Sequence, residues 1–316
     1  MLRYRNSVRR SLLLGVSVLA LTAAAPELAR PADLPTKAPI LKAAPEANPT
    51  VTMFIEGGPM WTGGGGINYF DPAFGFSRSI GRPPVGWTIA GGVDYQFAAS
   101  PWHVSFDVRF GRSGKRTHNN SASFGYESGA ASSQATHREQ HWVTDFMVGR
   151  DIGIGQQSQL KVGLRVADLS ATTNYNGTYV SYYGSSYGYS FRQHSRFLGF
   201  GPRAAISGVF GIQGPWSIDY GAGIAVLYGN RTLNVTGSAC AACIPFPVGS
   251  FDSRAWVPNV DASVGLSYAF TQTVKATVGF QFDYYWHALR TFDLNRSPID
   301  IDRNYYGPFV RLTGRF

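Results

Sequence analysis

The last thirteen residues, NYYGPFVRLTGRF (304–316), fall into two sets when every second position is read. One set is mostly apolar and consists of Tyr306, Val310, Leu312, Gly314 and Phe316. The other carries two fixed positive charges and consists of Phe309, Arg311, Thr313 and Arg315. A chemical period of two predicts a β-strand with one apolar and one polar face. The apolar face needs an apolar environment, and the rest of the chain indicates what that environment is.

The same alternation recurs in nine earlier segments: 50–58, 86–97, 102–112, 141–150, 159–170, 197–210, 216–229, 255–270 and 273–286. Each segment has about the ten residues that a tilted membrane-crossing strand needs. Short turns between the segments alternate with long polar connections, at 62–85, 113–139, 170–195, 229–253 and 288–304. A barrel inserted from one side of a membrane produces this pattern, with turns inside and long loops outside. We therefore predict an all-β fold, a closed antiparallel transmembrane β-barrel of about ten strands.

Two soluble β-domains would show the same alternation, with the charged face in water. Two observations favour the membrane barrel. Charged residues make up 15% of the chain, below the usual quarter of a soluble domain. Five tryptophans lie near the predicted strand ends, as in the aromatic girdles of membrane barrels: Trp87, Trp102, Trp142, Trp216 and Trp286. The charged face must then be the lumen, because charge on the lipid face costs roughly 2–4 kcal/mol at the midplane.

The polar face of the predicted strands defines the candidate pore lining. Its acids are Glu56, Asp94, Asp107, Asp145, Asp219, Asp261 and Asp283. Its bases are Arg109, Lys161, Arg165, Arg203, Lys275, Arg311 and Arg315. Unpaired charges are costly in a narrow interior, so we expect most of these groups to pair between neighbouring strands. A balanced, paired lining predicts a small and weakly ion-selective lumen.

The N-terminal residues predict export. Residues 1–25 combine four arginines with the apolar run SLLLGVSVLALTAAA, which is typical of a secretory signal peptide. Its boundary could extend to residue 32, and an uncleaved anchor is the alternative. Removing those four arginines lowers the formal charge from +9 to +5, so the basic balance gives little support for nucleic-acid binding. Residues 26–49 are rich in Pro and Ala and predict a periplasmic linker, which leaves 50–316 for the barrel.

Several motifs could carry chemistry. Cys240 and Cys243 in CAAC predict a loop disulfide in an exported protein, with a redox centre as the alternative. The histidines of HREQH (137–141) would lie about 13 Å apart in an extended chain, so we expect no metal there. The Gly run 63–66 lacks the Lys and helix of a phosphate loop. The six histidines of the chain are scattered along the sequence. We therefore expect no enzyme and no cofactor, and keep an outer-membrane hydrolase as a weaker alternative.

One part of the chain resembles a known family. The segment FLGFGPRAAISGVFGIQGPWSIDYGAGIAVLYG (197–229), VPNVDASVGLSY (257–268), VGFQFDYYWHAL (278–289) and YYGPFVRL (305–312) are similar to the Legionella-type major outer-membrane protein family. The similarity covers roughly the C-terminal 120 residues. It implies a pore-forming barrel with passive permeation and no catalytic residues. Separately, PADLPTKAP (31–39) is similar to the start of mature alphaproteobacterial outer-membrane proteins.

The predicted function follows from barrel, lining and resemblance. We expect a narrow diffusion pore for small hydrophilic solutes in the outer membrane of a Gram-negative bacterium. The alternative is a structural protein or surface adhesin with a closed lumen, since 117–134 and 174–191 are rich in Tyr, Ser, Gly and Asn, residues that give adaptable recognition surfaces. Expected partners are outer-membrane lipid, solutes and, by analogy with other barrels, the assembly machinery through the terminal Phe316. No nucleic acid is expected.

Overall fold

The computed structural model describes residues 49–71, 76–123, 129–153, 157–181, 183–238, 248–293, 295 and 297–316. The predicted signal peptide, nearly all of the linker, and Cys240 and Cys243 lie outside these residues. Within them the secondary structure is strand and turn. A search of the same residues for helices long and apolar enough to cross a membrane finds none.

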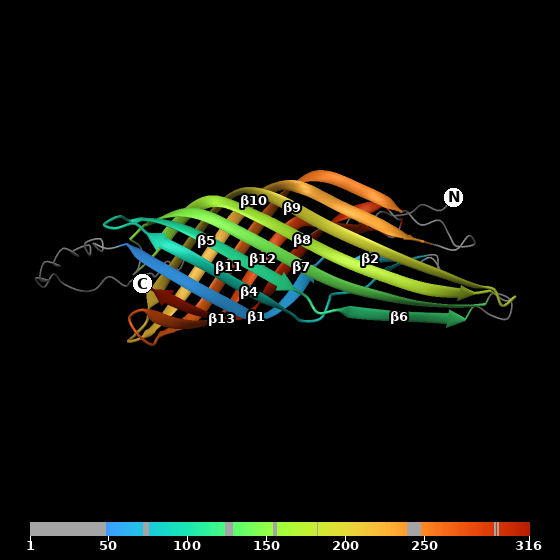
Figure 1. The fold of residues 1–316 in the computed structure, drawn as a ribbon, viewed down its shortest axis with the longest axis horizontal. Coiled ribbons are helices and arrows are strands. Elements are labelled where there is room, and N and C mark those ends of the chain that lie inside the picture. Colours follow the sequence, from blue (N-terminus) through green and yellow to red (C-terminus); the bar gives the residue numbers. More distant parts are fainter. Residues whose placement is uncertain are drawn as a thin grey trace, which may run out of the picture. The chain divides into compact units, whose positions relative to one another are not determined.

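Thirteen strands are described. Their bounds are β1 Thr50–Gly64, β2 Asn68–Asp71, β3 Phe76–Ser79, β4 Gly86–Gln96, β5 Trp102–Arg112, β6 Arg116–Ser123, β7 Ala130–Asp151, β8 Gln159–Val180, β9 Ser186–Gly211, β10 Trp216–Ser238, β11 Gly249–Ala269, β12 Val274–Phe292 and β13 Pro298–Arg315. Ten of them form a closed antiparallel ring in the order β1, β4, β5, β7, β8, β9, β10, β11, β12 and β13 (Figure 1). The ring confirms the predicted barrel and its ten strands.

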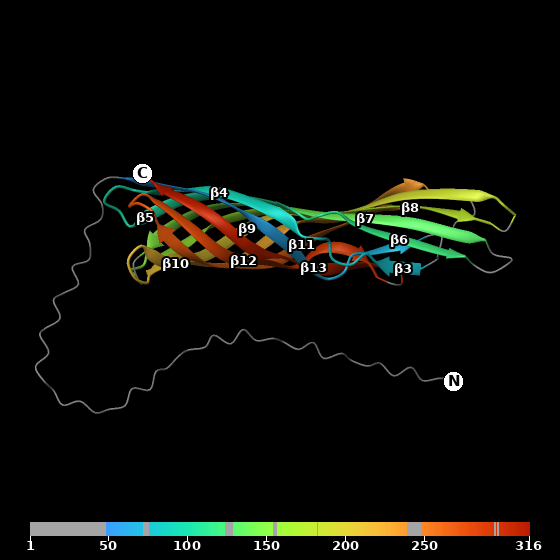
Figure 2. The same ribbon diagram turned by 90° about the horizontal axis from the view of Figure 1, so that it is seen from below.

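The chain closes the ring with its own first and last strands, β1 and β13, which run side by side in Figure 2. The backbone N–H of Val51 donates to the carbonyl of Phe316 at 2.9 Å, and the N–H of Phe316 donates to the carbonyl of Val51 at 2.8 Å. Closure therefore extends to the last residue and leaves no unpaired edge between these two strands, as a membrane barrel requires.

The outward side chains of the ring form an apolar band between two levels of exposed tryptophan. Trp102 and Trp216 lie near the short turns, and Trp87, Trp142 and Trp256 lie towards the other end. We call the outward apolar side chains between these levels the apolar band. Examples are Ile55, Val162, Ile224 and Val278, each between 57% and 63% exposed. So many exposed branched side chains would be unfavourable in water, which agrees with a lipid-facing surface.

Several strands, among them β7 and β8, extend well past the others at one end of the ring, which we call the hairpin end (Figure 1). β8 has 22 residues and β9 has 26, and they pair without interruption up to Val180 and Ser186. The prediction that 113–139 and 170–195 are long polar loops is therefore wrong for most of their length, which is β-strand. The sequence did not reveal these strands, because their outward positions are occupied by Ser, Thr, Asn and Arg. The alternation between apolar and polar residues is therefore absent there.

A second sheet, the β2–β3 hairpin, fills part of the ring interior at the hairpin end. Its residue Asn68 donates its backbone N–H to Thr291 Oγ1 on β12 at 2.9 Å and accepts a hydrogen bond from Gln193 on β9 at 3.1 Å. Tyr69 is fully buried, and its ring centroid lies 5.4 Å from that of Tyr175 on β8. The predicted external loop 62–85 thus turns partly inward, because it carries apolar side chains that need covering.

Candidate functional site: the charged interior of the barrel

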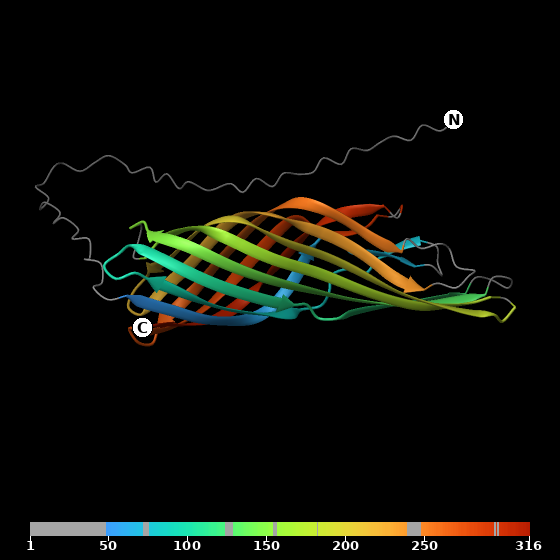
Figure 3. The ribbon, with the colours of Figure 1, turned by 45° about the horizontal axis from the view of Figure 1, so that its top comes forward.

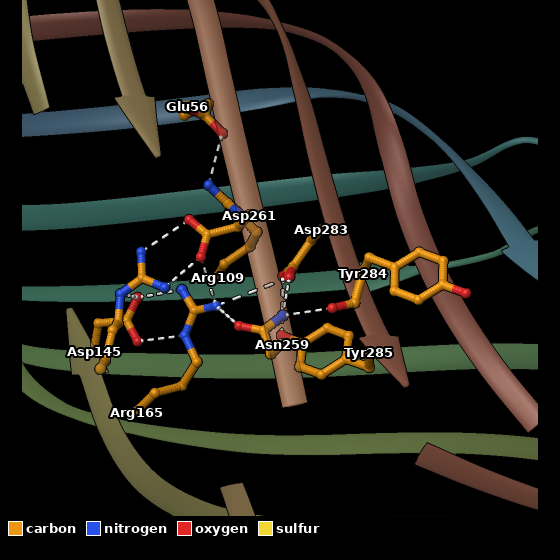
Figure 4. A network of polar contacts seen from close by, with 10 residues as sticks. Glu56, Arg109, Asp145, Arg165, Asn259, Asp261, Asp283, Tyr284 and Tyr285 are labelled. Carbon is orange, nitrogen blue, oxygen red and sulfur yellow. Dashed lines mark hydrogen bonds and ion pairs between the residues drawn. The ribbon is translucent and has the colours of Figure 1, made fainter. Parts of the chain in front are cut away.

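The centre of the barrel interior holds a network of charged side chains from four strands (Figure 4). Arg165 on β8 donates to both oxygens of Asp145 on β7, from Nε at 2.7 Å and from Nη2 at 2.6 Å. Its Nη1 lies 3.1 Å from Asp261 on β11. Arg203 on β9 contacts the same two acids, through Nη2 to Asp261 at 2.8 Å and Nε to Asp145 at 3.4 Å. Two arginines therefore share two carboxylates.

The network leaves little room for larger groups at neighbouring positions. Gly223 on β10 lies opposite Asp261 in the β10–β11 register. A Cβ added at Gly223 would lie 2.6 Å from Nη2 of Arg203. Glycine at this position therefore leaves the space that the guanidinium group of Arg203 occupies.

Asp283 on β12 extends the network across the interior. It accepts hydrogen bonds from Asn259 Nδ2 at 2.6 Å and from the hydroxyl of Tyr285 at 2.9 Å. Arg165 Nη1 lies 3.8 Å from the same carboxylate. Arg165 and Tyr285 are at most 2% exposed, so the interior is filled by side chains at this level.

A second set of charges connects β1, β13 and β5. Arg311 on β13 donates to Glu56 Oε2 on β1 from Nε at 2.9 Å and from Nη2 at 2.6 Å. Arg109 on β5 lies 3.7 Å from the other oxygen of Glu56. Glu56 is 2% exposed. One buried carboxylate again contacts two arginines.

Closer to the short turns, two lysines each contact an acid. Lys161 on β8 donates to Asp94 on β4 at 2.7 Å, and His103 on β5 lies 2.8 Å from the same acid. Lys275 on β12 donates to Asp219 on β10 at 2.6 Å. The strands of these lysine pairs are not neighbours in the ring. The expectation of neighbouring-strand pairs therefore holds for Asp145–Arg165 and Glu56–Arg311 but is wrong here, because long side chains reach across a narrow interior.

Two of the fourteen predicted lining residues are placed differently from the rest. Asp107 on β5 lies opposite Asp145 in the β5–β7 register, and among the described residues it has no ion-pair partner within 4 Å. Arg315 lies opposite Thr52 at the end of β13. The other twelve form the contacts described above.

The sequence did not predict a further buried cluster towards the hairpin end. Glu139 on β7 lies 3.2 Å from Arg303 Nε on β13 and 3.0 Å from His137 Nε2. Burial alone would raise the pKa of Glu139, but Arg303 and the hydrogen bond with His137 outweigh it and hold the pKa below its ordinary value. His137 and Glu139 belong to the HREQH motif (137–141). The described residues contain no group of three His, Cys, Asp or Glu arranged to hold a metal ion.

The cavity next to the central network is small. It is lined by Arg109, His141, Asp283 and Tyr305 among others and has a volume of about 10 Å³. One water molecule needs about this much space. This cavity is therefore too small to hold a solute larger than water.

The comparisons with known proteins bear on the whole barrel. The model of the family described as Legionella pneumophila major outer membrane protein precursor matches residues 81–315. The chain belongs to this family. Membership agrees with the barrel fold and places the chain among outer-membrane proteins of Gram-negative bacteria. No curated protein matches the chain in sequence.

The chain is also similar to several solved structures, each at low sequence identity. The outer membrane protease OmpT from Escherichia coli is 10% identical, with a TM-score of 0.46, over 84% of this chain and 97% of that chain. Neisserial surface protein A is 9% identical, with a TM-score of 0.27, over 83% and 95%. The CymD monoaromatic hydrocarbon channel is 9% identical, with a TM-score of 0.34, over 86% and 89%. At these identities the likeness concerns the fold alone.

Proposed function

We propose that the protein is a narrow, weakly selective channel for ions and small hydrophilic solutes, described here in a closed form. The supporting observation is that charged side chains fill the interior along the apolar band, from Asp94 and Lys161 near the turns to Glu56 and Arg311. Buried ion pairs often stabilise a protein less than apolar side chains of similar volume. A barrel that functions only through its surface could have an apolar interior of similar volume, whereas a channel for polar solutes needs polar side chains along its lumen.

The shared carboxylates suggest how the channel opens. Arg165 and Arg203 both contact Asp145 and Asp261. When one guanidinium group moves away, the other still contacts both acids, so neither carboxylate is left without a positively charged neighbour. The balance of acids and bases along the lining also supports weak selectivity.

Conductance in a planar bilayer tests this proposal. We expect small, weakly selective conductance steps for the wild-type protein. Arg203→Ala shortens one of the two arginines and should raise conductance and shift selectivity towards cations. Arg196→Ala is the matched control, because it removes an arginine of an outward-facing pair with Asp168 and leaves the interior unchanged. Wild-type conductance typical of a wide porin, or strong anion selectivity, would contradict the paired-lumen channel.

The second candidate is a closed surface protein that displays β-structure. It is favoured by the long strands of the hairpin end and by the β2–β3 hairpin, whose Tyr69 is fully buried. Under either candidate we propose that the hairpin end faces the cell exterior, and neither includes a catalytic step. If no conductance is seen for the wild-type protein, for Arg203→Ala or for Arg311→Ala, the surface role replaces the channel.

A further inference from the structure

The outward face of the barrel changes from apolar to basic immediately beyond the apolar band at the hairpin end. The last apolar row across the strands contains Phe110, Trp142 and Leu198, with Asp168 between the last two. Because opposite residues of paired strands face the same side, the next rows also point outward. The first of these consists of Arg112, Gln140, Ser170 and Arg196. Two further rows consist of Arg138, Thr172 and His194, and of Thr136, Asn174 and Arg192.

These rows place four arginines on β5, β7 and β9, with β8 between the last two strands. We call Arg112, Arg138, Arg192 and Arg196 the arginine patch. Figure 3 shows the strands that carry it running together towards the hairpin end. Asp168 is the only acid in the four rows, and it contacts Arg196 through two hydrogen bonds, at 2.9 and 2.6 Å. The patch therefore keeps an excess of positive charge.

Three of the arginines have no acid to neutralise them. Among the described residues, Arg112, Arg138 and Arg192 form no ion pair, and the Nε atoms of Arg112 and Arg138 are buried without a hydrogen-bond partner. Arg112 lies opposite Gln140, and Arg138 is the next outward residue on that strand. Two like charges in diagonal cross-strand positions repel each other. An anion between them would remove this repulsion and satisfy the unused donors.

Neutral hydrogen-bonding groups lie between the arginines of β7 and those of β9. The hydroxyl groups of Ser170 and Thr172 on β8 occupy this position, and Thr172 Oγ1 lies 2.9 Å from Nδ1 of His194. Burial together with the charges of Arg192 and Arg196 lowers the pKa of His194 below its ordinary value. That direction is the expected response of a histidine in a positive local field.

We propose that the arginine patch binds the phosphate groups of a phosphorylated lipid in the outer leaflet. The geometry favours a lipid over a free anion, because exposed apolar side chains lie directly beside the patch. Trp142 and Leu198 are 53% and 45% exposed and belong to the neighbouring row of outward residues, on the side of the apolar band. Two residues along a strand span about 7 Å, so a headgroup at the patch places its acyl chains against the apolar band. Arginine is suited to this ligand because its planar donors match phosphate oxygens. The proposal rests on the outward orientation of the hairpin end and is independent of whether the lumen conducts.

Lipid binding to the folded barrel tests the proposal. Native mass spectrometry of the detergent-solubilised protein, titrated with lipid A as the phosphorylated lipid and with phosphatidylcholine as the zwitterionic one, gives a Kd for each. We expect tighter binding of lipid A and a loss of about fivefold for Arg138→Gln, since one basic residue near an anionic surface contributes about this factor. Arg112→Gln combined with Arg138→Gln should weaken binding further. Higher ionic strength should weaken it as well.

The matched control is Arg150→Gln. Arg150 lies on the same strand and the same outward face as Arg138, but at the turn end, where its guanidinium carbon is 5.7 Å from the ring of Trp102. It should bind lipid A as the wild type does. Unchanged binding in both patch variants, or an equal loss in Arg138→Gln and Arg150→Gln, would overturn the proposal. Full competition by inorganic phosphate would show a free-anion site instead, and a gel shift between unheated and heated samples checks that each variant is folded.

Discussion

At the scale of single residues, the chain contains two ion pairs of the same geometry in different surroundings. Arg165–Asp145 joins β8 to β7 inside the barrel, and Arg196–Asp168 joins β9 to β8 on its outer surface. Each is bidentate through Nε and Nη2. The arginine side chain is 2% exposed in the first pair and 45% exposed in the second. The difference in burial, rather than in contact geometry, should decide what each pair contributes.

We predict that Arg165→Ala lowers the free energy of unfolding by about 3–5 kcal/mol, because it removes the bidentate partner of Asp145 and leaves two buried carboxylates, Asp145 and Asp261, with Arg203 as their shared cation. Arg196→Ala should cost about 0–1 kcal/mol, as for exposed pairs generally. Urea unfolding of both variants in the same lipid vesicles measures the two values. Equal losses would mean that the interior is more hydrated than the structure indicates.

His194 provides a second test at this scale. Removing a neighbouring positive charge by Arg192→Gln should raise the pKa of His194 towards its ordinary value, because that charge helps to lower it. Since the folded-state pKa is the lower one, the unfolded state binds the proton more tightly, and this site lowers stability as the pH falls through the ordinary histidine range. NMR titration, with His194→Gln to assign the resonance, measures the shift. No shift in the variant would contradict the local positive field.

At the scale of elements, the β2–β3 hairpin and the central network occupy the interior at two different levels, and in the proposed channel each would restrict passage. Asn68→Ala with Tyr69→Ala removes the side-chain contacts of the hairpin with β12 and β8 but leaves the network in place. We therefore predict little change in conductance for this variant alone. Combined with Arg203→Ala it should conduct more than either variant separately. Purely additive effects in single-channel recordings would show that the two restrictions do not act in series.

The orientation of the hairpins can be tested by labelling. Single cysteines at Ser132, Ser185 and Gln157, in a background without Cys240 and Cys243, report on both ends of the barrel. Ser132 and Ser185 are exposed at the hairpin end, and Gln157 is exposed at a turn. A membrane-impermeant reagent on intact cells should label the first two positions. Labelling of Gln157→Cys to the same extent would reverse the proposed topology.

The ten crossing strands could be predicted because their outward face is apolar and their inward face polar. The dependence on this alternation also explains which strand segments were not predicted. Beyond the apolar band both faces of β8 and β9 are polar or mixed, so only backbone pairing reveals the strands. The alternation alone was enough to predict which acids and bases face the interior. It did not predict their ion-pair partners, because pairs such as Lys161–Asp94 depend on how the ring closes. Asn68 and Tyr69 were missed because a loop that turns inward shows no period.

At the scale of the whole molecule, closure of the ring should make unfolding of the barrel cooperative. Every strand of the ring is paired on both sides, and the last pair joins Phe316 to Val51 through two backbone hydrogen bonds. Opening the ring in lipid or detergent would expose the edges of two strands at once, and unsatisfied backbone groups are costly in an apolar medium. We expect the barrel to remain folded in SDS until it is heated.

The protein should therefore migrate faster on a gel when it is not boiled than when it is boiled. The compact barrel binds less detergent and has a smaller radius than the unfolded chain, so the shift reports closure directly. Deleting Phe316 removes both hydrogen bonds to Val51 and should lower the temperature at which the fast band disappears. A truncation elsewhere, outside the ring, serves as the control, such as removal of residues 26–40. Identical mobility of boiled and unboiled protein after reconstitution in lipid would contradict a closed barrel, whatever its conductance.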